Sequence, residues 1–162
     1  MEGWAPDTVY NKMKILLIIA WLFGFPLSSH AQKTNVMETN QTQETEIKNV
    51  IENYYFKGIF EGNIELLRKA FYKNALLFGD IKGVPYSKTA EQYIEGVGSR
   101  ISPEKSGKPF EAKIISIDVI NSIATAKLNV KMYDFNYYNF ITFHKINGEW
   151  LIVNKTLTDV KP

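Results

Sequence analysis

The last third of the chain alternates apolar and polar residues with a period of two, and this pattern constrains the fold more than any other feature. The alternation begins after Pro109 and continues to the carboxyl terminus. Successive side chains of a strand point to opposite faces of a sheet, so the pattern predicts four strands. The clearest of them carries Thr, Lys and Asn on one face and these apolar residues on the other: Ala124, Ala126, Leu128, Val130 and Met132.

A hairpin joins the last two predicted strands, 137–146 and 149–157. Between them lies Asn147-Gly148, a pair that favours a tight turn because both central positions need a positive φ angle. The turn sets the register and places Phe143, Trp150 and Ile152 on one face, opposite Thr142, His144, Leu151 and Val153. Both faces of the hairpin carry apolar groups, and helices can cover only one of them. We therefore expect the outer face of the sheet to contact a second copy of the chain in a homodimer.

Three helices are predicted before Pro109, because apolar residues recur there at helical spacing. The first begins at Glu44 and carries Tyr54 and Tyr55 on its apolar face. The second is capped by Asn63 and closes at Asn74, and the third follows a cap at Ser87 or Thr89 and ends at Gly98. A strand is expected over 75–80, a turn over 82–85 and a loop over 102–108. In the strand over 110–120, the slip at Ile114-Ile115 predicts a β-bulge or a strand covered on both faces.

The amino-terminal segment is predicted to be a signal peptide, residues 1–31. Lys12 and Lys14 precede the uncharged run 15–27, which is too short to cross a bilayer, and small residues follow up to Ala31. We expect cleavage after Ala31, a periplasmic or secreted mature protein and no stable membrane anchor after processing. An uncleaved anchor is the alternative. Residues 1–12 read as an extension upstream of an initiator at Met13.

The remaining chain divides into a polar linker, 32–43, and one domain, 44–160, without internal repeats. The chain has no cysteine and two histidines, which excludes disulfides, zinc fingers and iron–sulfur clusters. Asp80, Asp134 and His144 show no metal-ligand spacing, so we expect neither a metal nor a cofactor. Basic and acidic residues, 19 and 17 in number, are interspersed, and this pattern indicates no nucleic-acid partner.

A family resemblance rests on the segment 143–155, which reads FHKINGEWLIVNK. It is similar to the K-x-x-G-x-W-x-I-x-N-K ending of the "Putative lumazine-binding", SnoaL-like branch of the nuclear-transport-factor-2-like superfamily. Segments 46–62 and 67–78 resemble the superfamily's first helix and the passage into its first strand. The resemblance covers 44–157 and implies a cystatin-like α+β cone, in which three helices pack on a curved antiparallel sheet. The branch's name implies a pteridine-like ligand. Tyr72 stands where relatives often have His, and Asn139-Phe140 where they often have Asp-Tyr.

The superfamily that the chain resembles includes an enzyme, ketosteroid isomerase, whose catalysis needs a tyrosine, a carboxylate base and a protonated acid. Tyr54 or Tyr55 and Asp80 stand at matching places, but Phe140 occupies the position of the acid. His144 is the histidine that remains after processing and could act as a base or contact a ligand. The alternative interpretation makes the tyrosines core residues, Asp80 a turn residue and His144 a surface residue.

We therefore predict an exported domain that binds a small, partly apolar molecule without known catalysis. One alternative is a lyase or isomerase with Asp80 or His144 as general base, and another is a dimeric interaction module with a filled cone. Aromatic residues, among them Tyr86 and Tyr137, could line an apolar cavity with hydroxyl groups. The predicted ligand-binding residues are Tyr54, Tyr55, Phe78, Asp80, Tyr93, Tyr138, Phe140 and His144, and no catalytic residue is assigned.

Overall fold

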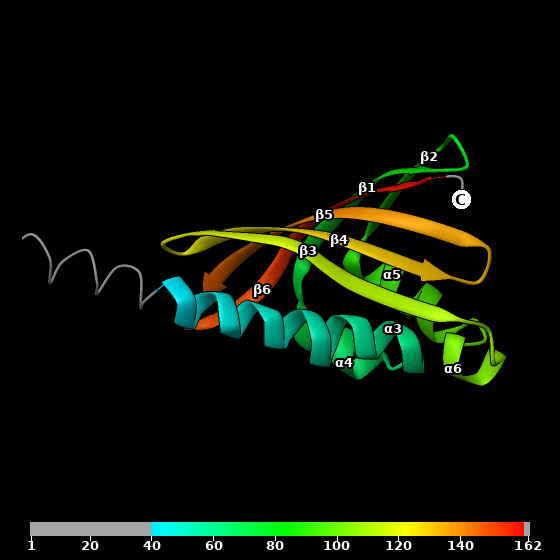
Figure 1. Cartoon of the computed structure of the whole chain (residues 1–162), viewed down its shortest axis with the longest axis horizontal. Helices are drawn as coiled ribbons and strands as arrows, with labels where there is room; N and C mark the ends of the chain where they lie inside the picture. The colour runs from blue at the N-terminus through cyan, green and yellow to red at the C-terminus, as the bar shows by residue number, and fades with distance from the viewer. Residues whose placement is uncertain (1–39, 161–162) are drawn as a thin grey trace, which may run out of the picture. The chain divides into compact units, whose positions relative to one another are not determined.

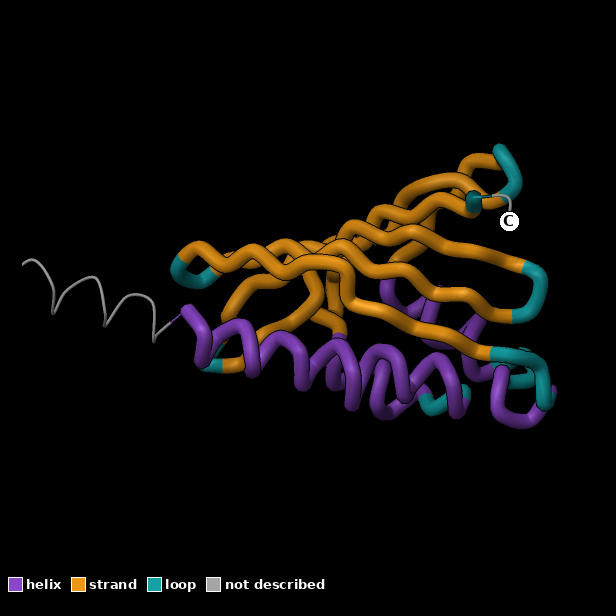
Figure 2. The backbone as a smooth tube through the Cα atoms, viewed as in Figure 1, coloured by secondary structure: helices purple, strands orange, loops and turns teal. Residues whose placement is uncertain are grey.

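A six-stranded sheet forms the framework of this protein, and the helices lie on one side of it, as Figures 1 and 2 show. The structure is a computed structural model that describes residues 40–160. It confirms the predicted α+β fold class. The predicted signal peptide, the upstream extension and linker residues 32–39 lie outside the described residues. None of the helices within 40–160 has the length and hydropathy needed to cross a membrane.

The first helix is longer than its apolar stripe predicts. Residues 40–49 are helical and continue through a π-helical segment, η1 (Val50–Phe56), into α3 (Lys57–Glu61). Residues 40–43 were predicted as linker but are helical, and within this part of the helix Thr45 Oγ1 donates to the carbonyl of Gln41 at 2.9 Å. The helix ends at Gly62, whose φ of 69° is left-handed.

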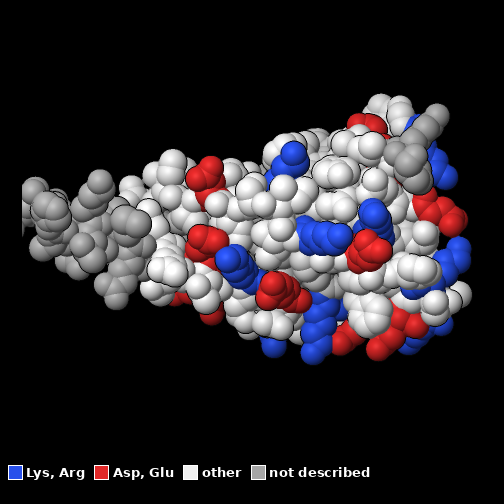
Figure 3. Space-filling view, in the orientation of Figure 1, with Lys and Arg blue, Asp and Glu red and all other residues white. Residues whose placement is uncertain are grey.

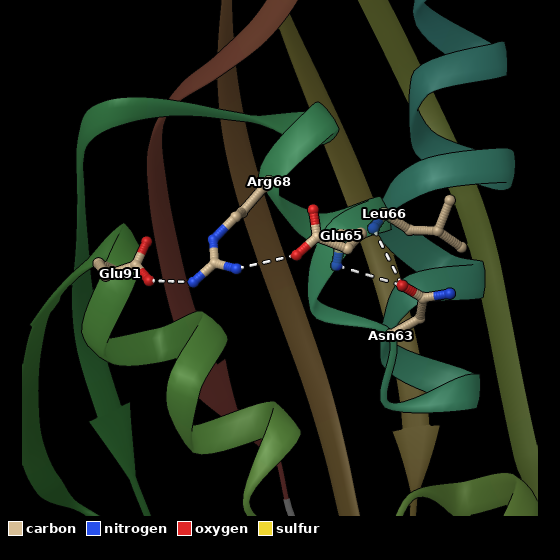
Figure 4. Close-up of polar contacts among 5 residues, drawn as sticks. All are labelled: Asn63, Glu65, Leu66, Arg68 and Glu91. Carbon is tan, nitrogen blue, oxygen red and sulfur yellow. Dashed lines mark hydrogen bonds and ion pairs between the residues drawn. The ribbon is translucent and has the colours of Figure 1, made fainter.

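The next two helices are fixed by side-chain caps. The Asn63 oxygen accepts the backbone N–H groups of Glu65 and Leu66 at 3.1 and 3.2 Å and starts α4 (Ile64–Ala70), as predicted (Figure 4). Arg68 pairs with Glu65 and with Glu91, and so ties α4 to α5 (Ala90–Gly98) (Figure 4). Thr89 caps α5 in a capping box with Gln92.

The sheet has the strand order β2-β1-β6-β5-β4-β3. The strands are β1 (Phe71–Ile81), β2 (Val84–Thr89), β3 (Phe110–Ile120), β4 (Ile123–Met132), β5 (Phe135–Ile146) and β6 (Glu149–Asp159). β1 pairs with β6 in parallel, so the sheet is mixed and not wholly antiparallel as expected. The second helix was expected to reach Asn74, but β1 takes over at Phe71, and β2 replaces part of the turn expected over 82–85. A short helix, α6 (Pro103–Ser106), lies in the expected loop.

The carboxyl-terminal hairpin has the predicted register. Ile146 pairs with Glu149 and Phe143 with Ile152, around a turn in which Asn147 has a φ of 52° and Gly148 a φ of 86°. The bulge predicted at Ile114-Ile115 is confirmed as well, because the pairing with β4 shifts between Ile114 and Ser116.

A second bulge, in β6, was not predicted. Phe143 pairs with Ile152 but Thr142 pairs with Asn154, which leaves Val153 as the extra residue. An extra residue exchanges the two faces of a strand. Ile152 is therefore buried before the bulge, and Lys155 is buried after it.

The face of the sheet toward the helices forms the core, and the opposite face is partly apolar. The inward residues of β4 named above are all buried, as predicted. Phe78 and Phe140, by contrast, are 42% and 59% exposed. Basic and acidic side chains are intermixed on the surface seen in Figure 3, in agreement with their interspersed sequence.

Candidate functional site

A pocket of about 140 Å³ lies between the inner face of the sheet and the helices. In other proteins a cavity of about 150 Å³ holds a benzene molecule, so this one has room for a single ring. Side chains from η1, α3, α5 and strands β1, β2, β4, β5 and β6 line it. The lining residues are Tyr55, Ile59, Ile81, Tyr86, Lys88, Tyr93, Gly96, Val97, Arg100, Val130, Met132, Tyr137, Asn139, Lys155 and Leu157.

Four tyrosines supply both ring surface and hydroxyl groups to the pocket. Burial raises the pKa of Tyr55 and of Tyr93 well above the ordinary value, and that of Tyr137 to about 12. Burial also raises the pKa of Tyr86. All four hydroxyls therefore stay protonated at neutral pH and can donate hydrogen bonds.

Lys155 is the buried cation of the pocket. Its side chain is only 4% exposed, and Nζ lies 4.6 Å from the ring centroid of Tyr93 and 5.3 Å from that of Tyr55. None of the ion pairs within residues 40–160 includes it. Burial, with a contribution from the positive charge of Arg100, lowers the pKa of Lys155 to about 7.

Asn139 contributes a buried amide without a protein partner. The residue is 1% exposed, and neither its Nδ2 nor its Oδ1 has a hydrogen-bond partner among the described residues. Leaving such a group unpaired costs roughly 1–3 kcal/mol, and most buried polar groups avoid this cost. Asn139 is among the residues that line the pocket, so its amide is a candidate partner for a polar ligand group.

Two further cations line the pocket, and no acidic residue does. Arg100 stacks over the Tyr133 ring at 5.8 Å, and Lys88 lies 5.5 Å from the centroid of Tyr86. Asp and Glu are absent from the lining of this pocket. Across residues 40–160 there is no cluster of three or more His, Cys, Asp or Glu that could hold a metal ion.

The predicted site residues are divided between this pocket and other places. Tyr55 and Tyr93 line it. Tyr54 borders a separate hollow beside Trp150, and Tyr138 another beside Phe135. The structure therefore brings only two of the predicted residues together.

The remaining predicted residues lie outside the pocket lining. Asp80 accepts a hydrogen bond from Thr158 Oγ1 at 3.1 Å, and His144 is exposed on β5, where it pairs with Leu151. Phe78 and Phe140 are exposed. The arrangement of a tyrosine beside an Asp80 base is thus not formed in this pocket.

Sequence reasoning missed the polar half of the pocket, namely Lys88, Arg100, Asn139 and Lys155. Asn139 could have been found, because it alternates with Tyr137 and Ile141 on the inward face of β5. Lys155 could not, since extending the hairpin register through residue 155 places it on the outer face. Only the bulge at Val153 turns it inward.

Comparisons with known proteins point to one family. The family model described as "Putative lumazine-binding" matches residues 42–158. No curated protein matches the chain. Among solved structures, an NTF2-like protein of unknown function from Shewanella baltica OS155 is similar, with a TM-score of 0.66 and 21% identity over 75% of this chain and 96% of that one.

Two other NTF2-like proteins of unknown function show the same fold. The one from Silicibacter pomeroyi DSS-3 has a TM-score of 0.67 and 17% identity, covering 75% of this chain and 98% of its own. The one from Methylobacillus flagellatus KT has a TM-score of 0.66 and 21% identity, covering 74% and 93%.

Proposed function

Since the chain belongs to the "Putative lumazine-binding" family and has the NTF2-like fold, we propose that it binds a small, partly apolar molecule in the pocket between sheet and helices. The molecule has a flat ring or a similar apolar body. Its ring packs among the tyrosines, and its polar group faces Asn139 and Lys155. The proposed role is binding, and no catalytic residue is assigned.

The observation that carries this proposal is the unpaired amide of Asn139. A filled core would satisfy or exclude a polar group that is 1% exposed, because an unpaired amide destabilises the fold. Small-molecule sites combine apolar walls with a few buried polar groups that orient the ligand, and this pocket has both. The same observation argues against an interaction module with a filled cone.

The alternative of an isomerase or lyase has less support. Proton abstraction needs a base within hydrogen-bond reach of the substrate. Asp80 and His144, the two bases proposed from the sequence, lie outside the pocket lining. If a turnover is found, Asp80→Asn and His144→Gln should leave it nearly unchanged. A loss of about 100-fold in either folded variant would identify a general base and contradict the binding proposal.

A blocking variant tests the binding proposal. A Cβ atom added at Gly96, which lines the pocket, would meet only Lys88 Nζ, at 3.7 Å. Gly96→Leu should therefore fill the pocket without removing a polar group, and Glu95→Leu, on the exposed side of the same helix, is the matched control. Saturation-transfer NMR with a panel of single-ring compounds, charged and neutral, should show binding to the wild type and to Glu95→Leu but not to Gly96→Leu. Binding to none of the panel, or unchanged binding to Gly96→Leu, would contradict the proposal.

Export is proposed as part of the same function. The basic pair, the apolar run and the small residues before Gln32 support it. Intact mass of the protein recovered from an exporting bacterium should begin at Gln32. A membrane-bound product that retains Trp21 would contradict it.

A further inference from the structure

The charge of the pocket is one-sided. Lys88, Arg100 and Lys155 line it, no Asp or Glu does, and none of the ion pairs within residues 40–160 includes any of the three. Of the other lysines and arginines in the described chain, seven pair with a carboxylate, as Arg68 does with Glu65 and Glu91, and five exposed or partly exposed lysines do not. The pocket therefore concentrates positive potential where the fold supplies no counter-ion.

We propose that the ligand of this pocket is a small carboxylic acid with a single-ring body, whose carboxylate is bound by the Lys155 ammonium and the Asn139 amide. This rests on the proposed binding function and names the chemical class of its ligand. Lys155 is the charge partner, and Asn139 Nδ2 donates a hydrogen bond to a carboxylate oxygen. Arg100 and Lys88 add to the positive field.

Hydrogen-bonding capacity favours an acid over a neutral ligand. A carboxylate accepts several hydrogen bonds, and the pocket is rich in donors: the Lys155 ammonium, the Asn139 amide and the tyrosine hydroxyls. Ile59 and Val130 form apolar parts of the pocket wall, against which the ring of the ligand can pack. The volume of about 140 Å³ limits the body to one ring.

The burial of Lys155 gives an energetic reason for tighter binding of an acid than of a neutral ligand. Its desolvation is already part of the folded state, because the side chain is 4% exposed with no ligand present. Among the described residues only aromatic rings offset this loss of solvation. A bound carboxylate supplies the missing opposite charge in a site from which water is largely excluded, where ion pairing is strongest. A neutral ligand of the same shape supplies no charge that would hold the proton on Lys155.

Binding should therefore be linked to proton uptake. The groups that face Lys155 or share its pocket are Tyr55 of η1, Tyr86 and Lys88 of β2, Tyr93 of α5, Tyr137 of β5 and Arg100. None of them is an acid that is ionised at neutral pH, so nothing in the pocket holds the proton on Lys155 until the carboxylate arrives. Burial, with a smaller contribution from the charge of Arg100, lowers the pKa of Lys155 to about 7, and the carboxylate raises it. Above neutral pH the complex then takes up a proton.

Calorimetry with benzoate and its neutral isostere benzamide tests the proposal. At pH 7.5 the wild-type protein should bind benzoate at least about tenfold more tightly than benzamide. The binding enthalpy of benzoate should differ between triethanolamine and Tris buffers, neither of which supplies a competing anion, by an amount that corresponds to uptake of a fraction of a proton. Lys155→Met should lose the preference for benzoate and the buffer dependence, and should still bind benzamide. The matched control Lys73→Met, on an exposed position of β1, should behave as the wild type.

The outcomes separate this inference from the function on which it rests. Benzamide binding as tightly as benzoate, or an undiminished preference in Lys155→Met, would overturn the acid as ligand and leave the binding function standing. If neither compound binds, and the single-ring panel fails as well, both proposals are wrong. A preference for benzoate without proton uptake would overturn the assignment of Lys155 as the charge partner.

Discussion

Replacing Lys155 by methionine should stabilise the folded protein, although it removes the proposed ligand contact. Methionine is unbranched, similar in length and apolar, so it can occupy the same space among the tyrosine rings. Lys155 has a pKa of about 7 in the folded state against 10.5 in the unfolded chain. At 1.36 kcal/mol per pKa unit, keeping this amine in the fold costs roughly 4–5 kcal/mol at neutral pH. Lys155→Met should therefore gain a large part of that amount.

The pH dependence gives the sharper form of this prediction. Between the folded and unfolded pKa values of Lys155 the unfolded chain binds more protons, so the free energy of unfolding rises with pH in this window. From pH 7 to about pH 9.5 the expected rise is about 3 kcal/mol. The raised pKa values of the buried tyrosines act with the opposite sign, but only above about pH 10, where unfolded tyrosine begins to ionise.

Urea unfolding followed by tryptophan fluorescence measures this directly. The wild type and Lys73→Met should gain stability over the window, while Lys155→Met should be nearly flat and more stable than the wild type at pH 7. Equal slopes for the wild type and Lys155→Met, or a less stable Lys155→Met at pH 7, would refute the account of Lys155 as a buried and unpaired cation.

Three further predictions concern the fold and its assembly. Gly79→Ala should destabilise the protein by more than about 3 kcal/mol in urea unfolding, because a Cβ atom there would lie 1.8 Å from the carbonyl oxygen of Leu157. Thr89→Ala should cost about 1 kcal/mol through the lost cap of α5, visible as a lower melting temperature in circular dichroism. We propose a homodimer through the outer sheet face, where Phe78 and Phe140 are exposed: sedimentation at micromolar concentration should give a dimer, and the double substitution of both residues by serine a monomer.

The sequence predicted those parts of the fold correctly in which a single physical rule determines the local structure. The alternation in β4 requires its apolar residues to face the core, and all five are buried. The Asn147-Gly148 turn determines the pairing of β5 and β6, and the observed partners agree. Asn63 and Thr89 cap helices because their side chains satisfy free N–H groups. Each of these features depends on residues close together in the chain.

The rest depends on contacts between distant segments. The first two residues of β2 were expected within the turn over 82–85, because Gly83 and Pro85 are turn residues. Pairing with β1 makes residues 84–89 a strand. The bulge at Val153 coincides with a shift in the parallel pairing of β1, between Phe71 and Leu76. No pattern in the sequence of β6 predicts this change of register. The inward position of Lys155, and with it the charge of the candidate site, follows only once both strands are placed.

The central claim is that the tyrosine-lined pocket holds a small molecule, and native mass spectrometry of the purified mature protein tests it most directly. The account predicts that the wild-type protein carries the added mass of a single-ring acid, which is lost on collisional activation. The same added mass should be present on Glu95→Leu and absent from Gly96→Leu. Ligand-free protein should gain the mass of benzoate when that acid is supplied, again in Glu95→Leu and not in Gly96→Leu. If the wild type shows only its own mass as purified, with benzoate and with every compound of the single-ring panel, or if Gly96→Leu carries the same addition as the wild type, the pocket is not a ligand site and the account is contradicted.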